Sequence, residues 1–230
     1  MTVATLRKLC IDAVDPAVLG PFWAQALALE WRPDARPAQI REGGVYGAGD
    51  RPVLWVNQVP EPKRVKHRAH LDIYARALAD LEALGARVVL AEGNDRRWTV
   101  MTDPEDGEFC TFLRDPVPEP RLHGLVVDSE NPIAQARFWV EVLGGEVDEH
   151  AGRWATADHV PGMTFTFDFV PVPEPKTAPN RIHWDLSAPD LAPILSLGAT
   201  VVRDPGGEIS WHVLADPEGN EFCVFDASSA

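Results

Sequence analysis

The sequence is poor in cysteine, and its three cysteines, Cys10, Cys110 and Cys223, form no C-x-x-C pair. An odd number of widely spaced cysteines argues against a disulfide framework and fits a reducing compartment. The sequence also lacks the roughly 18 consecutive apolar residues that a membrane-spanning helix needs, and its first residues do not follow a signal-peptide pattern. We therefore expect a cytoplasmic protein with no membrane partner.

Basic residues are scarce as well, with 21 Lys and Arg against 35 Asp and Glu, for a formal net charge of −14. Such a surface repels the phosphates of nucleic acids and of anionic membranes, so we expect no nucleic-acid partner. The sequence contains no Gly-x-Ser-x-Gly, no HExxH and no P-loop. The glycine-rich segment 43–49 lacks the strand-to-helix context of a dinucleotide loop and is interpreted as a hairpin turn.

The sequence contains an internal duplication. Matches recur 116 residues apart around the first expected helix and 113 residues apart beyond it. The matched pairs are Phe22-Trp23 with Phe138-Trp139, PEPK at 60–63 with 173–176, His70 and Asp72 with His183 and Asp185, Trp98 with Trp211, and DPEDGEFC at 103–110 with DPEGNEFC at 216–223. The period is too long for a solenoid repeat, so each copy is expected to be a domain. We place the domains at 1–115 and 121–230, joined by a proline-rich linker at 116–120.

Within each half, hydrophobic patterning and turn residues predict the order strand, helix and three strands, twice over. In the first half the expected strands are 6–12, 37–41, 44–48, 52–58, 69–74, 86–90, 97–102 and 108–113, with helices at 16–29 and 76–84. In the second half they are 122–127, 145–150, 153–157, 163–170, 181–187, 199–203, 209–214 and 221–226, with helices at 132–143 and 189–197.

Two βαβββ units per half, the Phe-Trp pair on the first helix and the DPEDGEFC and DPEGNEFC segments resemble the vicinal oxygen chelate superfamily. More narrowly, the sequence is similar to glyoxalase-like domains. The resemblance implies an α+β fold of tandem glyoxalase-like domains, each with two βαβββ modules that form a curved, mostly antiparallel eight-stranded sheet. Two chains of single-domain relatives often pair to complete the cup-shaped sites. The duplication predicts a monomeric pseudo-dimer that completes them within one chain, or else a homodimer.

The resemblance also implies where a metal would bind: on the first strand, on the fifth strand and at a glutamate on the last strand. The first-strand position, fourteen residues before the aromatic pair, holds Lys8 in one half and Gly124 in the other, and neither is a good ligand. His123 lies one residue away, but strand side chains alternate between faces. We therefore expect His123 to point away from the cup, unless a β-bulge turns it.

The fifth-strand position holds His70 and its repeat His183, as in the family. The last-strand position holds cysteine in both halves, and a glutamate lies two residues earlier on the same face. Only one of three expected ligands is present, so we expect no metal cofactor. The alternative is Zn²⁺ or Fe²⁺ held by His183 and Glu221, or by His70 and Glu108.

The remaining site candidates come from the same strands. Cysteine beside histidine suggests a nucleophile, if the thiol is accessible and its pKa is low. The candidate catalytic residues are His70, Cys110, His183 and Cys223, and the candidate ligand-binding residues are Trp98, Trp211, Asp72 and Asp185. We expect Phe22, Trp23, Phe138 and Trp139 to dock helices and Trp184 to lie in the core. His67 should lie on the strand face opposite His70, which argues against a His-x-x-His metal pair.

Three functions remain open, because the fold hosts many activities. The leading hypothesis is a protein that binds a small organic molecule without a metal centre, as a divergent enzyme or as a drug- or metabolite-sequestering resistance protein of the bleomycin type. The second is a metal-dependent lyase, isomerase or dioxygenase. The third is a protein-interaction module.

Overall fold

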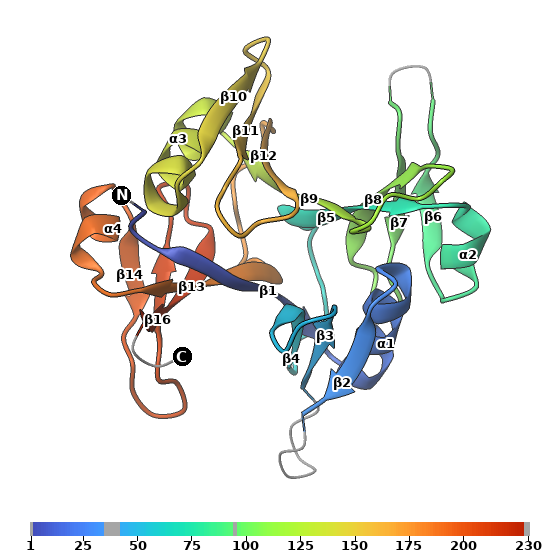
Figure 1. Ribbon diagram of the computed structural model, residues 1–230, viewed down its shortest axis with the longest axis horizontal. Helices are drawn as coiled ribbons and strands as arrows, with labels where there is room; N and C mark the ends of the chain where they lie inside the picture. Colours follow the sequence, from blue (N-terminus) through green and yellow to red (C-terminus); the bar gives the residue numbers. More distant parts are fainter. Residues whose placement is uncertain (1, 35–41, 94–95, 228–230) are drawn as a thin grey trace.

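The computed structural model describes residues 2–34, 42–93 and 96–227, which fold as βαβββ modules (Figure 1). The first module comprises β1 (Thr5–Ala13), α1 (Pro16–Ala26), β2 (Glu30–Pro33), β3 (Gly43–Tyr46) and β4 (Pro52–Gln58). The second comprises β5 (Ala69–Ala75), α2 (Leu78–Glu82), β6 (Arg87–Leu90), β7 (Thr99–Thr102) and β8 (Glu108–Leu113). The third comprises β9 (Leu122–Ser129), α3 (Pro132–Leu143), β10 (Glu146–His150), β11 (Trp154–Asp158) and β12 (Thr166–Pro171). The fourth comprises β13 (Ile182–Ala188), α4 (Ala192–Ser196), β14 (Thr200–Arg203), β15 (His212–Ala215) and β16 (Glu221–Asp226).

Within the described residues the strands form two eight-stranded sheets, which confirms the α+β fold of paired βαβββ modules. Sheet A has the order β14-β15-β16-β13-β1-β4-β3-β2, and sheet B has the order β10-β11-β12-β9-β5-β8-β7-β6. Each sheet is mostly antiparallel, with two parallel pairs that flank the central pair. The central pairs, β1 with β13 and β5 with β9, are antiparallel.

Each sheet combines one module from each sequence half. Sheet A joins the first and fourth modules, and sheet B joins the second and third. The segments 1–115 and 121–230 are therefore sequence repeats, and neither contains a whole sheet. The proline-rich segment 116–120 connects β8 to β9 within sheet B, whereas the chain crosses between the sheets at 59–68 and 172–181, which carry the PEPK repeats.

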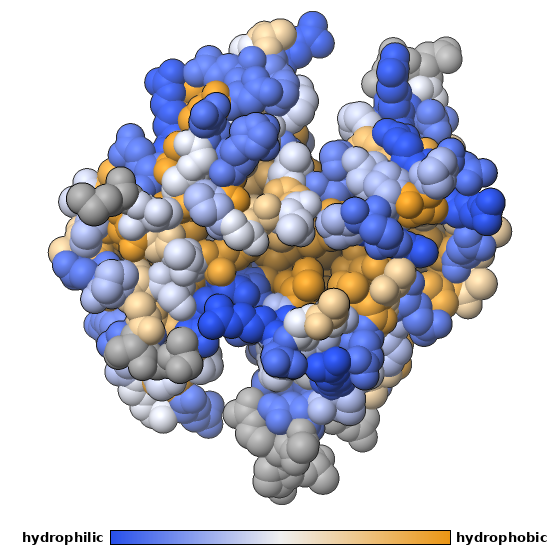
Figure 2. All heavy atoms as spheres, in the orientation of Figure 1, coloured by the Kyte–Doolittle hydropathy of each residue, from blue (hydrophilic) through white to orange (hydrophobic). Residues whose placement is uncertain are grey.

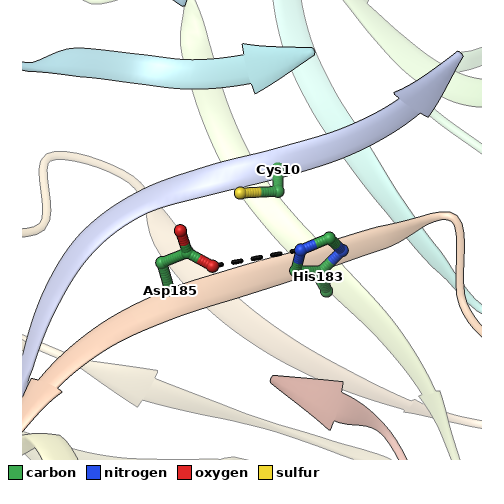
Figure 3. Close-up of side chains that lie close together, drawn as sticks. All are labelled: Cys10, His183 and Asp185. Atoms are coloured by element: carbon green, nitrogen blue, oxygen red, sulfur yellow. Dashed lines mark ion pairs between the residues drawn. The ribbon is translucent and has the colours of Figure 1, made fainter. Parts of the chain in front are cut away.

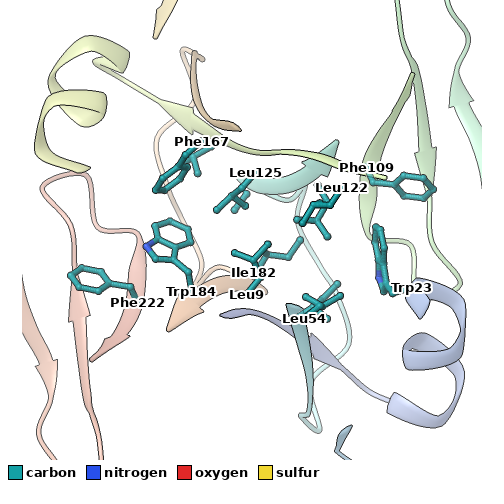
Figure 4. Close-up of a cluster of buried hydrophobic side chains, with 14 of the residues drawn as sticks. Leu9, Trp23, Leu54, Phe109, Leu122, Leu125, Phe167, Ile182, Trp184 and Phe222 are labelled. Atoms are coloured by element: carbon teal, nitrogen blue, oxygen red, sulfur yellow. The ribbon is translucent and has the colours of Figure 1, made fainter. Parts of the chain in front are cut away.

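The hydrophobic core lies between the two sheets. Figure 4 shows Leu9, Leu54 and Ile182 of sheet A facing Leu122 and Leu125 of sheet B, and these side chains are at most 4% exposed. Burying apolar area of this kind supplies most of the free energy of folding, at roughly 25 cal/mol per Å². The opposite face of each sheet therefore points away from the core.

Helices α1 and α3 close the core with their Phe-Trp pairs, as predicted. The Trp23 ring lies 5.3 Å from that of Phe109 in sheet B, and the Trp139 ring lies 5.1 Å from that of Trp184 in sheet A. Trp184 is fully buried, which confirms its predicted place in the core. Edge-on aromatic packing of this type adds about 1 kcal/mol per pair beyond the buried area.

The glutamates of the repeated Asp-Pro-Glu segments, at 103–105 and 216–218, hydrogen-bond to the backbone just before helices α1 and α3. Glu105 accepts hydrogen bonds from the backbone N–H groups of Val14 and Asp15 before α1, at 2.8 and 2.7 Å. Glu218 accepts from those of Glu130 and Asn131 before α3, at 3.0 and 2.7 Å. Carboxylates at helix N-termini satisfy unpaired donors and oppose the helix dipole. This duplicated motif therefore has a structural role.

Several elements end earlier than the patterning predicts. Helix α1 stops at Ala26 instead of residue 29, because Ala28 adopts a left-handed backbone with φ 55°. The strand expected at 37–41 lies outside the described residues, and β2 forms just before it. The segment expected to be a hairpin turn at 43–49 begins as strand β3. No helix in the described part of the chain combines the length and apolarity needed to cross a bilayer.

His67 provides a test of the buried structure near the first crossover. It is 7% exposed, and burial lowers its pKa to about 4 from 6.5, against the opposing effect of Glu108. The unfolded chain therefore binds a proton more readily between about pH 4 and pH 6.5, and the free energy of unfolding rises with pH through that window. The His67→Asn variant, which copies Asn180 of the other repeat, removes this dependence.

We expect the wild type to lose on the order of 3 kcal/mol relative to His67→Asn as the pH falls through that window. Urea unfolding of both proteins at several pH values measures the difference. Parallel stability curves for the two proteins would contradict the assigned pKa.

Candidate functional site

The outward face of each sheet forms a cup, named cup A and cup B after its sheet. In the orientation of Figure 1, the surface is notched at the top, between the outer strands of sheet B, and at the lower left, between the outer strands of sheet A (Figure 2). Because strand side chains alternate, residues two apart share a face. Leu71 and Ile73 of β5 enter the core, so His70, Asp72 and Tyr74 face cup B.

Cup B brings together His70, Asp72 and Cys110, which sequence reasoning had singled out. His70 Nε2 lies 3.4 Å from Asp72 Oδ1 and 3.5 Å from Cys110 Sγ. One ligand atom from each of the three lies within 4.8 Å of the others, a spacing that a metal ion can bridge. Asp72 is buried, and its carboxylate has the His70 imidazole and the Cys110 thiol as polar neighbours.

Cup A repeats the arrangement, but the cysteine of its cluster is Cys10 of β1, whereas the repeat of Cys110 is Cys223. Cys10, His183 and Asp185 offer ligand atoms within 4.8 Å of one another, and the His183 Nε2–Asp185 Oδ1 distance is 3.9 Å (Figure 3). Cys223 pairs in register with Asp185 on the neighbouring strand. Cys10 of β1, which the sequence interpretation used only as a member of the cysteine count, therefore belongs to the cup.

Register shifts in the central strand pairs turn one extra residue into each cup. In sheet B, Asp72 pairs with Gly124 but Ile73 pairs with Leu122, so His123 is bulged. The His123 ring stacks on Tyr74 at 4.6 Å, and its Nδ1 lies 2.9 Å from the Tyr74 hydroxyl. The expectation that His123 points away from the cup is wrong, because the bulge reverses the alternation of faces.

The matching shift in sheet A lies between Leu6 and Lys8. It places Arg7, the repeat of His123, over the Phe225 ring, with 4.6 Å from the guanidinium carbon to the ring centroid. Sequence reasoning missed Arg7, although the 116-residue offset aligns it with His123.

Lys8 and Gly124 occupy equivalent positions and make the two cups different. Lys8 Nζ binds Asp185 Oδ2 at 2.6 Å, and their side chains are 17% and 5% exposed. In cup B the same position has no side chain. A Cβ atom added to Gly124 would lie 2.7 Å from Thr166 Oγ1 and 3.2 Å from Asp168 Oδ2. In cup B the Thr166 and Asp168 side chains therefore pack against Gly124, where cup A has the lysine.

Asp168 is a site residue that the sequence interpretation missed. It stands at the repeat position of Trp55, in register with Val126, which in turn pairs with His70. Its carboxylate accepts hydrogen bonds from the Thr156 and Thr166 hydroxyls, both at 2.6 Å. Burial raises the pKa of Asp168, and the nearby Asp72 raises it further. The 113-residue offset could have revealed the exchange of tryptophan for aspartate.

The cysteines are poor nucleophiles in this setting. Burial raises the pKa of both Cys110 and Cys223 well above that of a free thiol, and Asp72 and Asp185, respectively, add to the effect. Both groups are therefore neutral thiols near pH 7, whereas thiolates are the reactive form.

The predicted glutamate ligands are engaged elsewhere. Lys63 Nζ binds Glu108 at 2.7 Å, and Lys176 Nζ binds Glu221 at 2.6 Å, so the PEPK lysines tie both glutamates to the crossovers. Neither glutamate belongs to a candidate metal group in the described residues, where Asp and Cys accompany the histidines. His67 also lies outside these groups.

Aromatic side chains line the cups beside these polar groups. The Trp98 ring lies 5.8 Å from that of Phe112, which in turn contacts His123 edge-on at 5.1 Å. In cup A, Trp211 stacks on Phe225 at 5.1 Å. Trp98 and Trp211 are half-buried, so part of each indole ring remains exposed.

The family description "Glyoxalase-like domain" matches residues 8–112 and 124–225, which include nearly every residue of both cups. The chain belongs to the glyoxalase-like domain family. Among solved structures, this glyoxalase-like chain is similar to glyoxalase I from Zea mays, with a TM-score of 0.67, 11% identity and coverage of 98% of this chain and 93% of that one.

A putative dioxygenase from Bacillus subtilis subsp. subtilis str. 168 gives a TM-score of 0.68 with 13% identity, covering 98% of this chain and 86% of that one. At such low identity these likenesses show a shared fold. No curated protein matches the sequence.

The Lys8–Asp185 pair of this glyoxalase-like protein can be tested directly. Replacing Lys8 with Met leaves a buried carboxylate unpaired, which we expect to lower the free energy of unfolding by on the order of 3 kcal/mol. The double variant Lys8→Met/Asp185→Leu should recover most of that loss, because both charges are gone. Urea denaturation measures the wild type, the two single variants Lys8→Met and Asp185→Leu, and the double variant.

Arg32→Met provides the control, since Arg32 pairs with Glu30 where the side chains are 44% and 63% exposed. Exposed pairs contribute about 0–1 kcal/mol. A double variant whose loss equals the sum of the single losses would show that Lys8 and Asp185 do not interact.

Proposed function

We propose that the protein is a metal-dependent enzyme that acts on a small organic molecule in cup B. The observation that carries the proposal is the cluster of His70, Asp72 and Cys110, whose ligand atoms lie within 4.8 Å of one another. Asp72 is buried, and at the position where Lys8 pairs with Asp185 in cup A, cup B has Gly124 and therefore no lysine. Buried charge requires compensation, and a cation held by this cluster provides it.

The donor set fits a divalent metal ion. His70, Asp72 and Cys110 combine imidazole, oxygen and sulfur ligands, which suits Zn²⁺ or Fe²⁺ better than Mg²⁺. This departs from the expectation of no metal cofactor, which rested on the finding that the sequence fills only one of the three ligand positions of the family. When bound, such an ion polarises a carbonyl oxygen or lowers the pKa of bound water.

The side chains around this position suit proton transfer. Asp168 has a raised pKa and is oriented by Thr156 and Thr166, so its carboxyl can hold or release a proton nearer to neutral pH than an ordinary aspartate can. Cys110 is a neutral thiol because its pKa is raised by burial and by Asp72, and coordination to a metal would remove its proton. Asp168 is therefore the group that we assign to general acid–base catalysis.

A pocket of about 370 Å³ adjoins the same end of cup B, lined in part by Tyr74, His123 and Thr166. This volume falls within the range of small-molecule sites, about 300–1,000 Å³. The similarity in fold to glyoxalase I and to a putative dioxygenase is consistent with a lyase, isomerase or dioxygenase activity.

A drug-sequestering role of the bleomycin-resistance type is the second candidate, and the aromatic walls beside Trp98 and Trp211 favour it. Such rings stack planar ligands without changing them. Because both sheets are completed within one chain, we expect a monomeric pseudo-dimer. The buried free thiols suit a reducing compartment such as the cytoplasm.

The metal site is tested by elemental analysis of protein purified without chelator and then dialysed against Zn²⁺. We expect one equivalent of metal per chain. His70→Ala removes a proposed ligand and should weaken metal binding by at least about 100-fold, whereas Asp168→Asn changes a neighbouring group and should weaken it by about 10–100-fold.

His183→Ala, at the matching position of cup A, is the control and should retain the metal. A wild type without stoichiometric metal would contradict the proposal, as would equal loss in the cup A variant. Recovery of a bleomycin-type ligand, bound tightly and unchanged by metal-free protein, would favour sequestration.

A further inference from the structure

We propose that cup A is a second ligand site that binds a small organic anion, a carboxylate attached to a planar group. The site is separate from cup B, and the inference does not depend on the proposed metal. It rests on an unpaired cation, a second cation beside it and the aromatic rings that surround both.

Arg7 supplies the unpaired charge. The bulge between Leu6 and Lys8 turns its guanidinium into the cup, where its Nη1 donates to Ser187 Oγ at 3.4 Å and its plane covers Phe225. Among the described residues, no carboxylate lies within ion-pair distance of Arg7. The chain carries a net charge of −14, so a half-buried arginine without an acidic neighbour is unusual here. Guanidinium groups bind carboxylates in a bidentate fork.

Lys8 lies next to Arg7 and takes up the negative charge of the nearby Asp185. Asp185 offsets the lysine, as their 2.6 Å contact shows, so the positive charge of Arg7 is left without a counter-charge. Lys8 Nζ also lies 5.4 Å from the Phe225 centroid and 5.9 Å from the Trp55 ring. A single negative charge on a ligand is therefore the charge that this cup lacks.

The aromatic groups define the rest of the ligand. Trp211 stacks on Phe225 with an angle of 28° between the rings, and Trp55 stands on the other side of Lys8, on β4. Trp55 and Trp211 are half-buried, so part of each ring remains open to the cup. Half-exposed rings beside a cation suit a flat ligand that carries its charge at one end.

Cup B supports the assignment by contrast. At the positions of Arg7, Lys8 and Trp55 it has His123, Gly124 and Asp168, so it has no lysine or arginine there and gains a carboxylate. An anion that fits cup A would meet like charge in cup B. These three differences in sequence therefore lead us to expect that cup A prefers an anionic ligand and cup B a cationic one.

The test uses benzoate and indole-3-acetate as probes, with the amides benzamide and indole-3-acetamide as neutral isosteres. Titrations follow tryptophan fluorescence and calorimetry in buffer with EDTA, so that a metal in cup B plays no part. We expect saturable binding of at least one carboxylate, with its amide at least about tenfold weaker. Arg7→Gln should weaken the carboxylate at least about tenfold, because a charge-assisted contact is lost.

His123→Gln, at the matching position of cup B, is the control and should bind the carboxylate like the wild type. Arg7→Lys keeps the charge without the fork and should bind with intermediate affinity. Thermal melting of each variant establishes that it is folded.

The proposal is overturned if neither carboxylate binds, if the amides bind equally well, or if folded Arg7→Gln retains full affinity. Tighter binding of inorganic phosphate than of either carboxylate would also overturn it, by assigning the cup to a phosphate ligand. A protein that binds carboxylates but no metal would leave this inference standing and refute the proposed function.

Discussion

The structure depends on the antiparallel pairing of β1 with β13 and of β5 with β9. These pairs join modules from opposite sequence halves, and they place Cys10 beside His183 in one cup and Gly124 beside Asp72 in the other. Each cup therefore takes its side chains from both repeats. The opposite faces of these strands supply core residues such as Leu9, Leu71 and Ile182. The same strand pairs therefore determine both where the sites lie and how the core is packed.

The two cups show how few exchanges are needed to change the electrostatics of a site. Histidine, aspartate and cysteine stand at matching positions of the two repeats, His70, Asp72 and Cys110 against His183, Asp185 and Cys223. In cup A, Lys8 pairs with the aspartate, whereas cup B has Gly124 at the position of the lysine. A buried carboxylate without a charged partner is costly, so the proposed metal ion of cup B would supply the compensation that the lysine supplies in cup A.

Much of this arrangement could be predicted from the sequence. The duplicated motifs gave the modules, and alternation along strands placed His70 and Asp72 on one face and Trp184 in the core. His123 was misplaced because a bulge depends on the register of the partner strand, which local sequence does not encode. Asp168 was missed because its place in the cup follows from the register of β12 with β9 and β5, which brings it near His70 and Asp72. Which modules share a sheet is likewise a long-range property, decided by packing between distant segments.

The crossovers at 59–68 and 172–181 have an evolutionary consequence. Either repeat alone would contain two half-sheets that belong to different cups, so it would need a second copy to complete them. A gene encoding one repeat would thus produce an obligate dimer with identical sites. With two copies in one chain, the two sites can differ in sequence. Neither site can form without both repeats, because each sheet takes one module from each repeat.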